Sequence, residues 1–198
     1  MKVVIASHNA HKAEEICRLF DGFSLNIAWY NYATFEVEVE PIENAQTFAE
    51  NALSKARFAV EHTGLPALAD DSGLEVAALG GEPGVHSHRW AGDTSDAERN
   101  QLLLKRLGTA EDRSARFVCA MALVLPAGHY ALTSGEIHGL ITSEPRGGHG
   151  FGYDPIFLIP SLGATFGELS PTEKNAWSHR ARAAQHMAPL LKGLLSYA

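Results

Sequence analysis

The sequence holds very little cysteine, because only Cys17 and Cys119 occur in 198 residues. Both lie among apolar neighbours, so we expect free buried thiols in a reducing compartment and no disulfide framework. Long apolar runs are missing too, since none approaches the ~18 residues that a membrane span needs. The opening MKVVIAS has one lysine and an apolar stretch too short for a signal peptide. We therefore expect a cytoplasmic protein without membrane contact.

An excess of basic residues is also absent, since 16 Lys and Arg stand against 23 Asp and Glu, a net charge of −7. This balance argues against a nucleic-acid-binding protein, which would usually carry a basic face. It still allows one phosphorylated small molecule to bind in a locally basic cleft. Repeats, low-complexity tracts and linkers are absent as well, and 198 residues can bury one sizeable core, in one or two lobes.

Helix and strand signals alternate along the chain. Ala13, Ile16, Cys17 and Phe20 recur at helical spacing directly after a β-rich run. Pro189 should kink or break the last helix. Strands are expected at 2–7, 35–40, 66–70, 115–126 and 129–142, and helices at 8–20, 47–64, 95–108 and 170–195. This interleaving predicts an α/β protein with a mixed sheet.

Two adjacent carboxylates, Asp70 and Asp71, follow an apolar run and precede Ser72 and Gly73. Neighbouring residues on a strand point to opposite faces, so one carboxylate can face a cleft while the other braces the structure. The alternative is a polar strand end that leads into a Ser-Gly turn.

The stretch SHNAHK (7–12) lies where the first strand hands over to the first helix. Free backbone N–H groups and the helix dipole favour an anion there. A lysine in the first turn, Lys12, is unfavourable against the dipole and needs a negative partner, which a bound phosphate would supply. A solvated polar turn is the alternative, and a metal pair of His8 and His11 is disfavoured because cations that accompany phosphates prefer oxygen ligands.

The second expected helix carries Asn51 and Lys55 one turn apart on one face. A solvated lysine would look the same. Upstream, Glu43 has no evident structural duty. It is therefore the natural second carboxylate for a Mg²⁺ ion held by Asp71, because Mg²⁺ takes one or two protein carboxylates and otherwise water and phosphate oxygens.

Glycines crowd the stretch GGHGFGYDP (147–155), with aromatic residues between them. Glycine lets the backbone approach a ligand closely, and an aromatic face can stack on a base. A tight loop whose aromatics fill the core is the alternative. Further along, EKNAWSHR (173–180) places basic residues around a possible helix break, where Arg180 could donate to a carbonyl or phosphate oxygen.

The motifs follow one another as VIASHNAHK, TFAENALSKA, ALADDSGLEV, GGEPGVHSHRWAG, GFGYDPIF and EKNAWSHR. In this order the sequence resembles the inosine triphosphate pyrophosphatase family over nearly its whole length. The resemblance implies one domain at 1–198, an elongated two-lobed α/β protein with a mixed sheet, flanking helices and a central cleft. It implies a Mg²⁺-dependent hydrolase, commonly a homodimer. Such an enzyme converts ITP, dITP and XTP to the monophosphate and pyrophosphate, which cleanses the nucleotide pool before these bases enter DNA or RNA.

The resemblance also implies roles for individual residues. Asp71 would be catalytic and would share the Mg²⁺ ion with Glu43. The residues implied to bind the nucleotide are Ser7, His8, Asn9, Ala10, His11, Lys12, Lys55, Ser72, Arg89, Phe151, Gly152, Tyr153, Asp154, Lys174, His179 and Arg180.

Base selection would depend on a donor that pairs with the carbonyl at position six of hypoxanthine and xanthine. Arg180 or a backbone N–H of residues 147–152 could supply it, and either would reject the amino group of adenine. Two alternatives stay open at this point: a pyrophosphatase for modified pyrimidine nucleotides, and a nucleotide-binding regulator without turnover. Paired acids beside phosphates argue against the regulator.

Overall fold

The computed structural model describes residues 1–23, 25–39 and 41–195. Its strands form a seven-stranded sheet in the order β2-β1-β3-β4-β5-β6-β7. β1 pairs in parallel with β2 and β3, whereas β6 pairs antiparallel with β5 and β7. The predicted α/β class with a mixed sheet and flanking helices is thus confirmed.

The bounds of the strands and helices are as follows. The strands are β1 (Lys2–Ile5), β2 (Ala28–Tyr30), β3 (Ala67–Val76), β4 (Ser114–Val124), β5 (Tyr130–Ile141), β6 (Phe157–Ile159) and β7 (Ala164–Thr165). The α-helices are α1 (Ala10–Asp21), α2 (Phe48–Thr63), α3 (Asp96–Leu107), α4 (Pro171–Trp177) and α5 (His179–Leu195). Short 3-10 helices are η1 (Tyr32–Phe35), η2 (Ala77–Leu79), η3 (Gly84–His86), η4 (Asp154–Ile156) and η5 (Phe166–Glu168).

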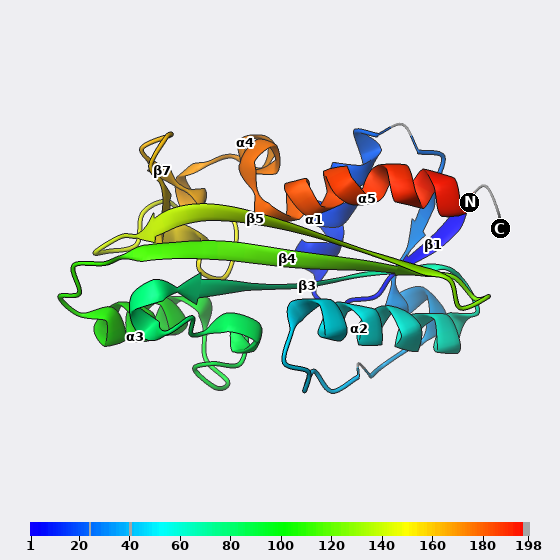
Figure 1. Ribbon diagram of the computed structural model, residues 1–198, viewed down its shortest axis with the longest axis horizontal. Coiled ribbons are helices and arrows are strands. Elements are labelled where there is room, and N and C mark those ends of the chain that lie inside the picture. Colours follow the sequence, from blue (N-terminus) through cyan, green and yellow to red (C-terminus); the bar gives the residue numbers. More distant parts are fainter. Residues whose placement is uncertain (24, 40, 196–198) are drawn as a thin grey trace. The chain divides into compact units, whose positions relative to one another are not determined.

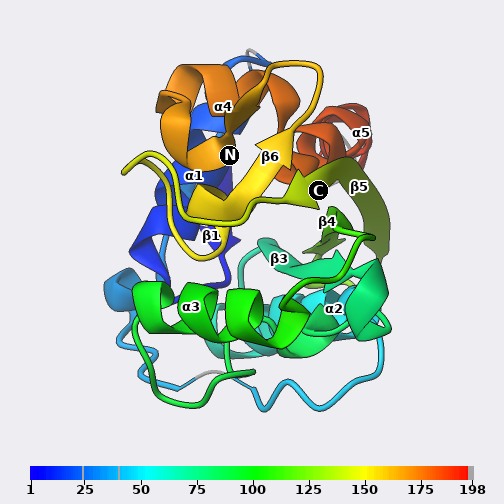
Figure 2. The same cartoon turned by 90° about the vertical axis from the view of Figure 1, so that its left-hand side faces the viewer.

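The chain divides into two compact units, each with its own hydrophobic core. Unit 1 comprises Met1–Asp71, Cys119–Gly135 and His179–Ala198, and unit 2 comprises Ser72–Val118 and Glu136–Ser178. In unit 1, α1 and α5 lie together on one face of the strands and α2 covers the other (Figure 1). In unit 2, α3 lies on one face of the strands and α4 on the other (Figure 2). Among the described residues, no helix combines the length and apolar character needed to cross a membrane.

Helix ends follow the predicted capping residues closely. Thr47 accepts a hydrogen bond from the Glu50 N–H at the start of α2, and Gly64 ends that helix in the left-handed conformation at φ 66°. Ser170 caps α4 with a full capping box. These caps satisfy backbone groups that a helix end leaves unpaired, which is why the sequence marks them well.

Two strand predictions differ from the structure. The alternating run 35–40 forms no strand over its described residues: Glu36 adopts φ 54°, which ends η1 and interrupts an extended course. Its last residue, Glu40, lies outside the described residues. By contrast, β3 does not end at Asp70 but continues to Val76, because it is a central strand that is buried along most of its length. The alternative of a strand end that leads into a Ser-Gly turn is therefore wrong, and the two aspartates lie in mid-strand.

The C-terminal helix also differs from expectation in one respect. The chain breaks at Ser178, whose ψ of 154° is extended, and thereby separates α4 from α5 as the sequence suggested. Pro189, however, lies inside α5, which runs on to Leu195 without a break.

Candidate active site

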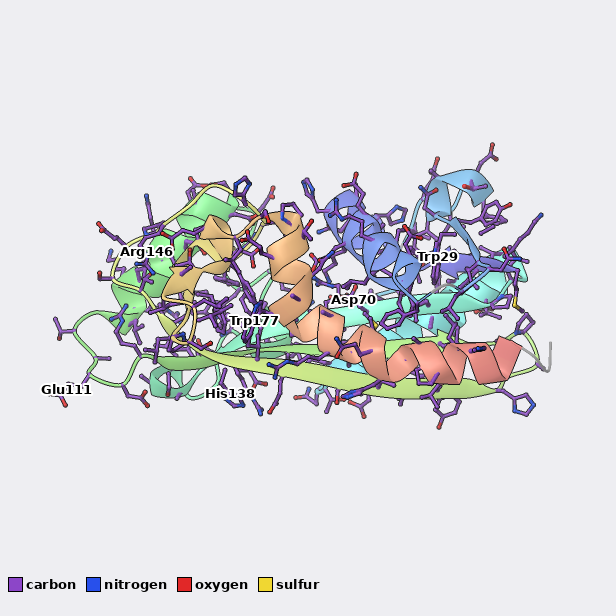
Figure 3. All side chains as sticks on the ribbon, turned by 90° about the horizontal axis from the view of Figure 1, so that it is seen from above. Trp29, Asp70, Glu111, His138, Arg146 and Trp177 are labelled. Carbon is purple, nitrogen blue, oxygen red and sulfur yellow. The ribbon has the colours of Figure 1, made fainter. Side chains whose placement is uncertain are left out.

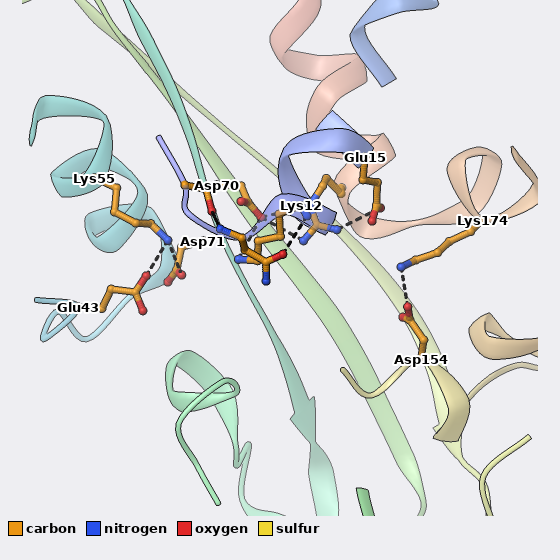
Figure 4. Close-up of polar contacts among 11 residues, drawn as sticks. Lys12, Glu15, Glu43, Lys55, Asp70, Asp71, Asp154 and Lys174 are labelled. Carbon is orange, nitrogen blue, oxygen red and sulfur yellow. Dashed lines mark hydrogen bonds and ion pairs between the residues drawn. The ribbon is translucent and has the colours of Figure 1, made fainter. Parts of the chain in front are cut away.

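Asp71 lies at the centre of a polar cluster in unit 1. Its Oδ1 accepts a hydrogen bond from Lys55 Nζ at 3.1 Å, and its Oδ2 accepts one from Asn51 Nδ2 at 3.0 Å. Lys55 Nζ also contacts Glu43 Oε1 at 2.7 Å (Figure 4). The helical spacing of Asn51 and Lys55 places both on the face of α2 that meets β3. One ammonium group thus joins the two carboxylates that the sequence predicted to share a metal ion.

Negative charge exceeds positive charge in this cluster, because two carboxylates, Glu43 and Asp71, share the one ammonium group of Lys55. Burial raises the pKa of Asp71, and the nearby Glu43 charge raises it further, while Lys55 acts in the opposite direction. Burial alone would lower the pKa of Lys55, but the charges of Asp71, Asp70 and Glu43 outweigh it and raise that pKa. Lys55 therefore stays protonated, and Asp71 is a carboxylate whose affinity for a proton is increased.

Asp70 points to the opposite face of β3, as adjacent strand residues must. Its Oδ2 accepts hydrogen bonds from Arg180 Nε at 3.2 Å and Nη2 at 3.1 Å. Arg180 Nη1 lies 3.1 Å from Glu15 Oε1, and Lys12 Nζ lies 3.6 Å from Asp70 Oδ2. This second cluster joins β3 to α1 and α5 inside unit 1 (Figure 4), and Figure 3 labels the position of Asp70.

Arg180 is fully buried, with only 1% of its surface exposed. Burial would lower the pKa of its guanidinium, yet Glu15 and Asp70 outweigh this and raise that pKa. In this structure the guanidinium is enclosed by carboxylates and has almost no surface to offer a nucleotide. Arg180 thus binds Asp70 and Glu15 in this structure, and its direct contact with the base stays a prediction.

The stretch 7–12 forms the turn that starts α1. Asn9 caps the helix by accepting a hydrogen bond from the Lys12 N–H at 3.1 Å, and Ser7 Oγ accepts one from the Asn9 N–H at 3.1 Å. Ala10 is the first residue of α1. The negative partner that Lys12 was expected to need is Asp70 in this structure. His8 and His11 are exposed, and the His8 ring lies 4.8 Å from that of Tyr32.

Unit 2 brings the glycine loop together with α4. Asp154 Oδ2 accepts hydrogen bonds from Lys174 Nζ at 2.7 Å and from the Phe151 N–H at 2.9 Å. Lys174 Nζ also lies 4.6 Å from the centroid of the Phe151 ring. Tyr153 is buried and its hydroxyl donates to the Ser87 carbonyl at 2.9 Å. The loop is therefore built around one ion pair with an aromatic face beside it.

The remaining predicted residues are placed as follows. Ser72 is half-buried on β3, directly after Asp71. Arg89 is exposed after η3, and its N–H donates to the His86 carbonyl. His179 is buried at the start of α5. The structure thus assembles Glu43, Lys55 and Asp71 in unit 1, and Phe151, Asp154 and Lys174 in unit 2.

Two members of these clusters were missing from the predicted site. Asn51 binds Asp71 through Nδ2 and accepts a hydrogen bond from the Ala45 N–H through Oδ1, so it links Asp71 to the segment that carries Glu43. Its position one turn before Lys55 was the available signal. Glu15 gave none, because an acid on an amphipathic helix is ordinarily solvated.

A metal ion would find two oxygen donors in unit 1. No group of three or more His, Cys, Asp and Glu side chains suited to a metal ion occurs in the part of the chain that the structure describes. Glu43 and Asp71 nevertheless reach the same Lys55 ammonium group, and 26% of the Glu43 side chain is exposed. Two carboxylates with room for further oxygen ligands suit a hard cation that also binds phosphates.

Comparison with known proteins identifies the family. The sequence matches the Ham1 family over residues 3–190. The chain belongs to the Ham1 family. A relative named dITP/XTP pyrophosphatase from Thermus thermophilus is 46% identical over 195 residues, which cover 97% of this chain and 92% of the relative. One of the same name from Frankia alni is 47% identical over 204 residues, covering 99% and 100%.

Solved structures of the Ham1 family agree with this assignment. A HAM1 protein from Coxiella burnetii superposes with a TM-score of 0.88 at 45% identity, covering 98% of this chain and 99% of that one. A dITP/XTP pyrophosphatase from Mycobacterium abscessus gives a TM-score of 0.75 at 42% identity, covering 96% and 100%. The resemblance inferred from the ordered motifs is therefore confirmed for the family and for the fold.

Proposed function

We propose that this protein hydrolyses ITP, dITP and XTP to the nucleoside monophosphate and pyrophosphate, and so cleanses the nucleotide pool. The observation that carries the proposal is the buried Asp71 carboxylate, oriented by Lys55 and Asn51. It occurs in a chain whose relatives over nearly the full length are named dITP/XTP pyrophosphatase.

In the proposed reaction Asp71 acts as the general base. It accepts a proton from the water molecule that attacks the α-phosphorus, and pyrophosphate leaves in line with that attack. Its raised pKa, caused chiefly by burial, increases its affinity for that proton. Asn51 and Lys55 each bond one carboxylate oxygen and keep the group from rotating.

Two lysines balance the charge of the triphosphate in this proposal. Lys55 is buried and protonated, so it stabilises negative charge on the phosphate oxygens in the transition state. Lys12 lies 3.6 Å from Asp70, a loose ion pair from which it can turn to a phosphate at the start of α1. Residues Ser7–Lys12 would supply further backbone N–H groups to the same phosphates.

Glu43 and Asp71 are the residues that would hold the metal ion, which we propose to be Mg²⁺. When bound, Mg²⁺ would neutralise phosphate charge and polarise the phosphorus centre. Glu43 reaches the cluster from a segment without regular structure, and its contact with Lys55 at 2.7 Å directs its carboxylate toward Asp71.

The nucleoside would be held by the glycine loop. Phe151 offers a face for stacking, and the Asp154–Lys174 pair fixes the loop beneath it. Because Arg180 is enclosed, we assign the contact with the carbonyl at position six to a backbone N–H of residues 147–152. Homodimer formation, which the resemblance implies, and a cytoplasmic location, which the composition and N-terminus led us to expect, stay predictions. Light scattering of the purified protein would test the first.

Metal removal tests the role given to Glu43. Excess EDTA should abolish activity and Mg²⁺ should restore it. Glu43→Gln removes one carboxylate ligand and should raise the Mg²⁺ concentration for half-maximal activity by about tenfold or more. Glu38→Gln is the matched control, since Glu38 is an exposed acid of the same segment. Undiminished activity in EDTA would show that no metal ion takes part.

The direct test of the proposal is pyrophosphate release from purified nucleotides. We expect release from ITP, dITP and XTP and very little from ATP. Release of pyrophosphate chiefly from modified pyrimidine nucleotides would favour the alternative of a pyrophosphatase for those nucleotides. Tight nucleotide binding without pyrophosphate release would favour the alternative of a nucleotide-binding regulator without turnover.

A further inference from the structure

Both backbone polar groups of Gly152 are held by side chains of α3. The Gly152 N–H donates to Asp96 Oδ2 at 2.6 Å, and the Gly152 carbonyl accepts a hydrogen bond from Asn100 Nδ2 at 3.0 Å. Asp96 and Asn100 lie four residues apart and therefore share one face of the helix. All three residues belong to unit 2. We call this arrangement the Gly152 clamp.

Asn100 is an unusual residue for its position. It is 98% buried, since only 2% of its surface is exposed, and its Oδ1 finds no hydrogen-bond donor among the described residues. A buried acceptor without a donor destabilises the folded state, so a leucine would serve the packing of α3 better. The contact with the Gly152 carbonyl is what accounts for an amide there.

The Gly152 clamp acts on a loop that Lys174 and the Ser87 carbonyl also contact. Gly152 adopts φ 63°, a conformation that favours glycine, and it stands between Phe151 and Tyr153. On one side the Phe151 N–H donates to Asp154, which pairs with Lys174. Fixing the Gly152 peptide groups therefore fixes the direction of the Phe151 ring relative to Asp154.

We propose that Asn100 and Asp96 are positioning residues that hold the loop 150–154 in the conformation that selects the nucleotide base. The inference rests on the proposed function, because base contact by this loop belongs to it. Discrimination between a carbonyl and an amino group needs donors fixed in direction. A loop freed from the clamp would bind ITP more weakly and distinguish it less from ATP. The reaction step, assigned to Asp71, would be nearly unchanged.

The test is Asn100→Leu, which removes the Nδ2 donor and puts an apolar side chain of similar size in its place. We expect KM for ITP to rise about tenfold with kcat within about twofold, and the ITP-to-ATP ratio of kcat/KM to fall about tenfold. Amide hydrogen exchange of residues 150–154 without nucleotide should accelerate about tenfold. Gln101→Leu is the matched control, because it makes the same kind of change at the next, exposed position of α3.

Unchanged selectivity and unchanged exchange in a folded Asn100→Leu protein would overturn the proposal. Should that variant not fold, Asp96→Ala removes the other arm of the Gly152 clamp at a side chain that is 48% exposed, and the same changes are expected. A wild-type protein that does not prefer ITP over ATP would refute the proposed function instead. The exchange measurement would still show whether α3 holds the loop.

Discussion

Replacing Asp71 with asparagine should lower kcat for ITP by at least ~10²-fold while the nucleotide still binds. The variant keeps the size of the side chain and one amide oxygen that can accept a hydrogen bond from Asn51 or Lys55, but it cannot accept the proton of the attacking water. It also removes a metal ligand. Because Asp71 is buried and its charge is disfavoured there, a neutral group should not unfold the protein. Initial rates of pyrophosphate release and nucleotide binding by calorimetry separate the two effects.

The matched control is the neighbouring carboxylate, Asp70. Asp70→Asn changes the opposite face of β3, where Arg180 and Lys12 lie, so it should cost stability but keep kcat within about tenfold of wild type. A near wild-type kcat for Asp71→Asn with Mg²⁺ present would show that Asp71 is structural. A loss of kcat in Asp70→Asn as large as in Asp71→Asn would show that the general base had been assigned to the wrong aspartate.

The second large effect is expected from Arg180→Met. This change leaves Asp70 and Glu15 as buried carboxylates without their shared guanidinium. Breaking a buried ion pair by removing one partner typically lowers the free energy of unfolding by about 3–5 kcal/mol. Urea denaturation followed by circular dichroism measures the loss.

Arg182→Met provides the comparison, since Arg182 lies on the same helix two residues further on and is exposed. It should change the free energy of unfolding by less than about 0.5 kcal/mol. Were Arg180→Met as stable as wild type but less selective for ITP over ATP, Arg180 would contact the base after all. Unchanged stability and unchanged selectivity would leave Arg180 without either role.

Local chemistry explains which parts of the fold the sequence predicted. Thr47, Ser95 and Ser170 each cap a helix through the N–H three residues on, and such caps depend only on neighbours in the chain. The strand prediction for the run 35–40 was wrong because alternation of apolar and charged residues does not by itself form a strand. Glu36 turns the backbone out of the extended region. β3 ran past its aspartates because its length is set by neighbouring strands.

The site was predictable in its residue types but not in its pairings. Glu43 and Asp71 were expected to share a metal ion and Lys55 to bind the nucleotide, and the structure brings the three side chains together. Arg180 was expected at the nucleotide, and the structure pairs its guanidinium with Asp70, 110 residues earlier in the chain, a pairing that the sequence did not indicate. A sequence shows that a charge is present, but its partner is determined by tertiary contacts. Asn51 was noted beside Lys55 but left out of the predicted site, and Asn100 was overlooked because a buried asparagine has no sequence pattern of its own.

Pyrophosphate release measured side by side with ITP and ATP tests the central claim most directly. We expect kcat/KM for ITP to exceed that for ATP by as much as ~10⁴-fold, with dITP and XTP close to ITP, because adenine presents a donor where the site requires an acceptor. The products of ITP should be IMP and pyrophosphate in equal amounts. Equal rates with ITP and ATP, or release of single phosphates from ITP, would contradict the account.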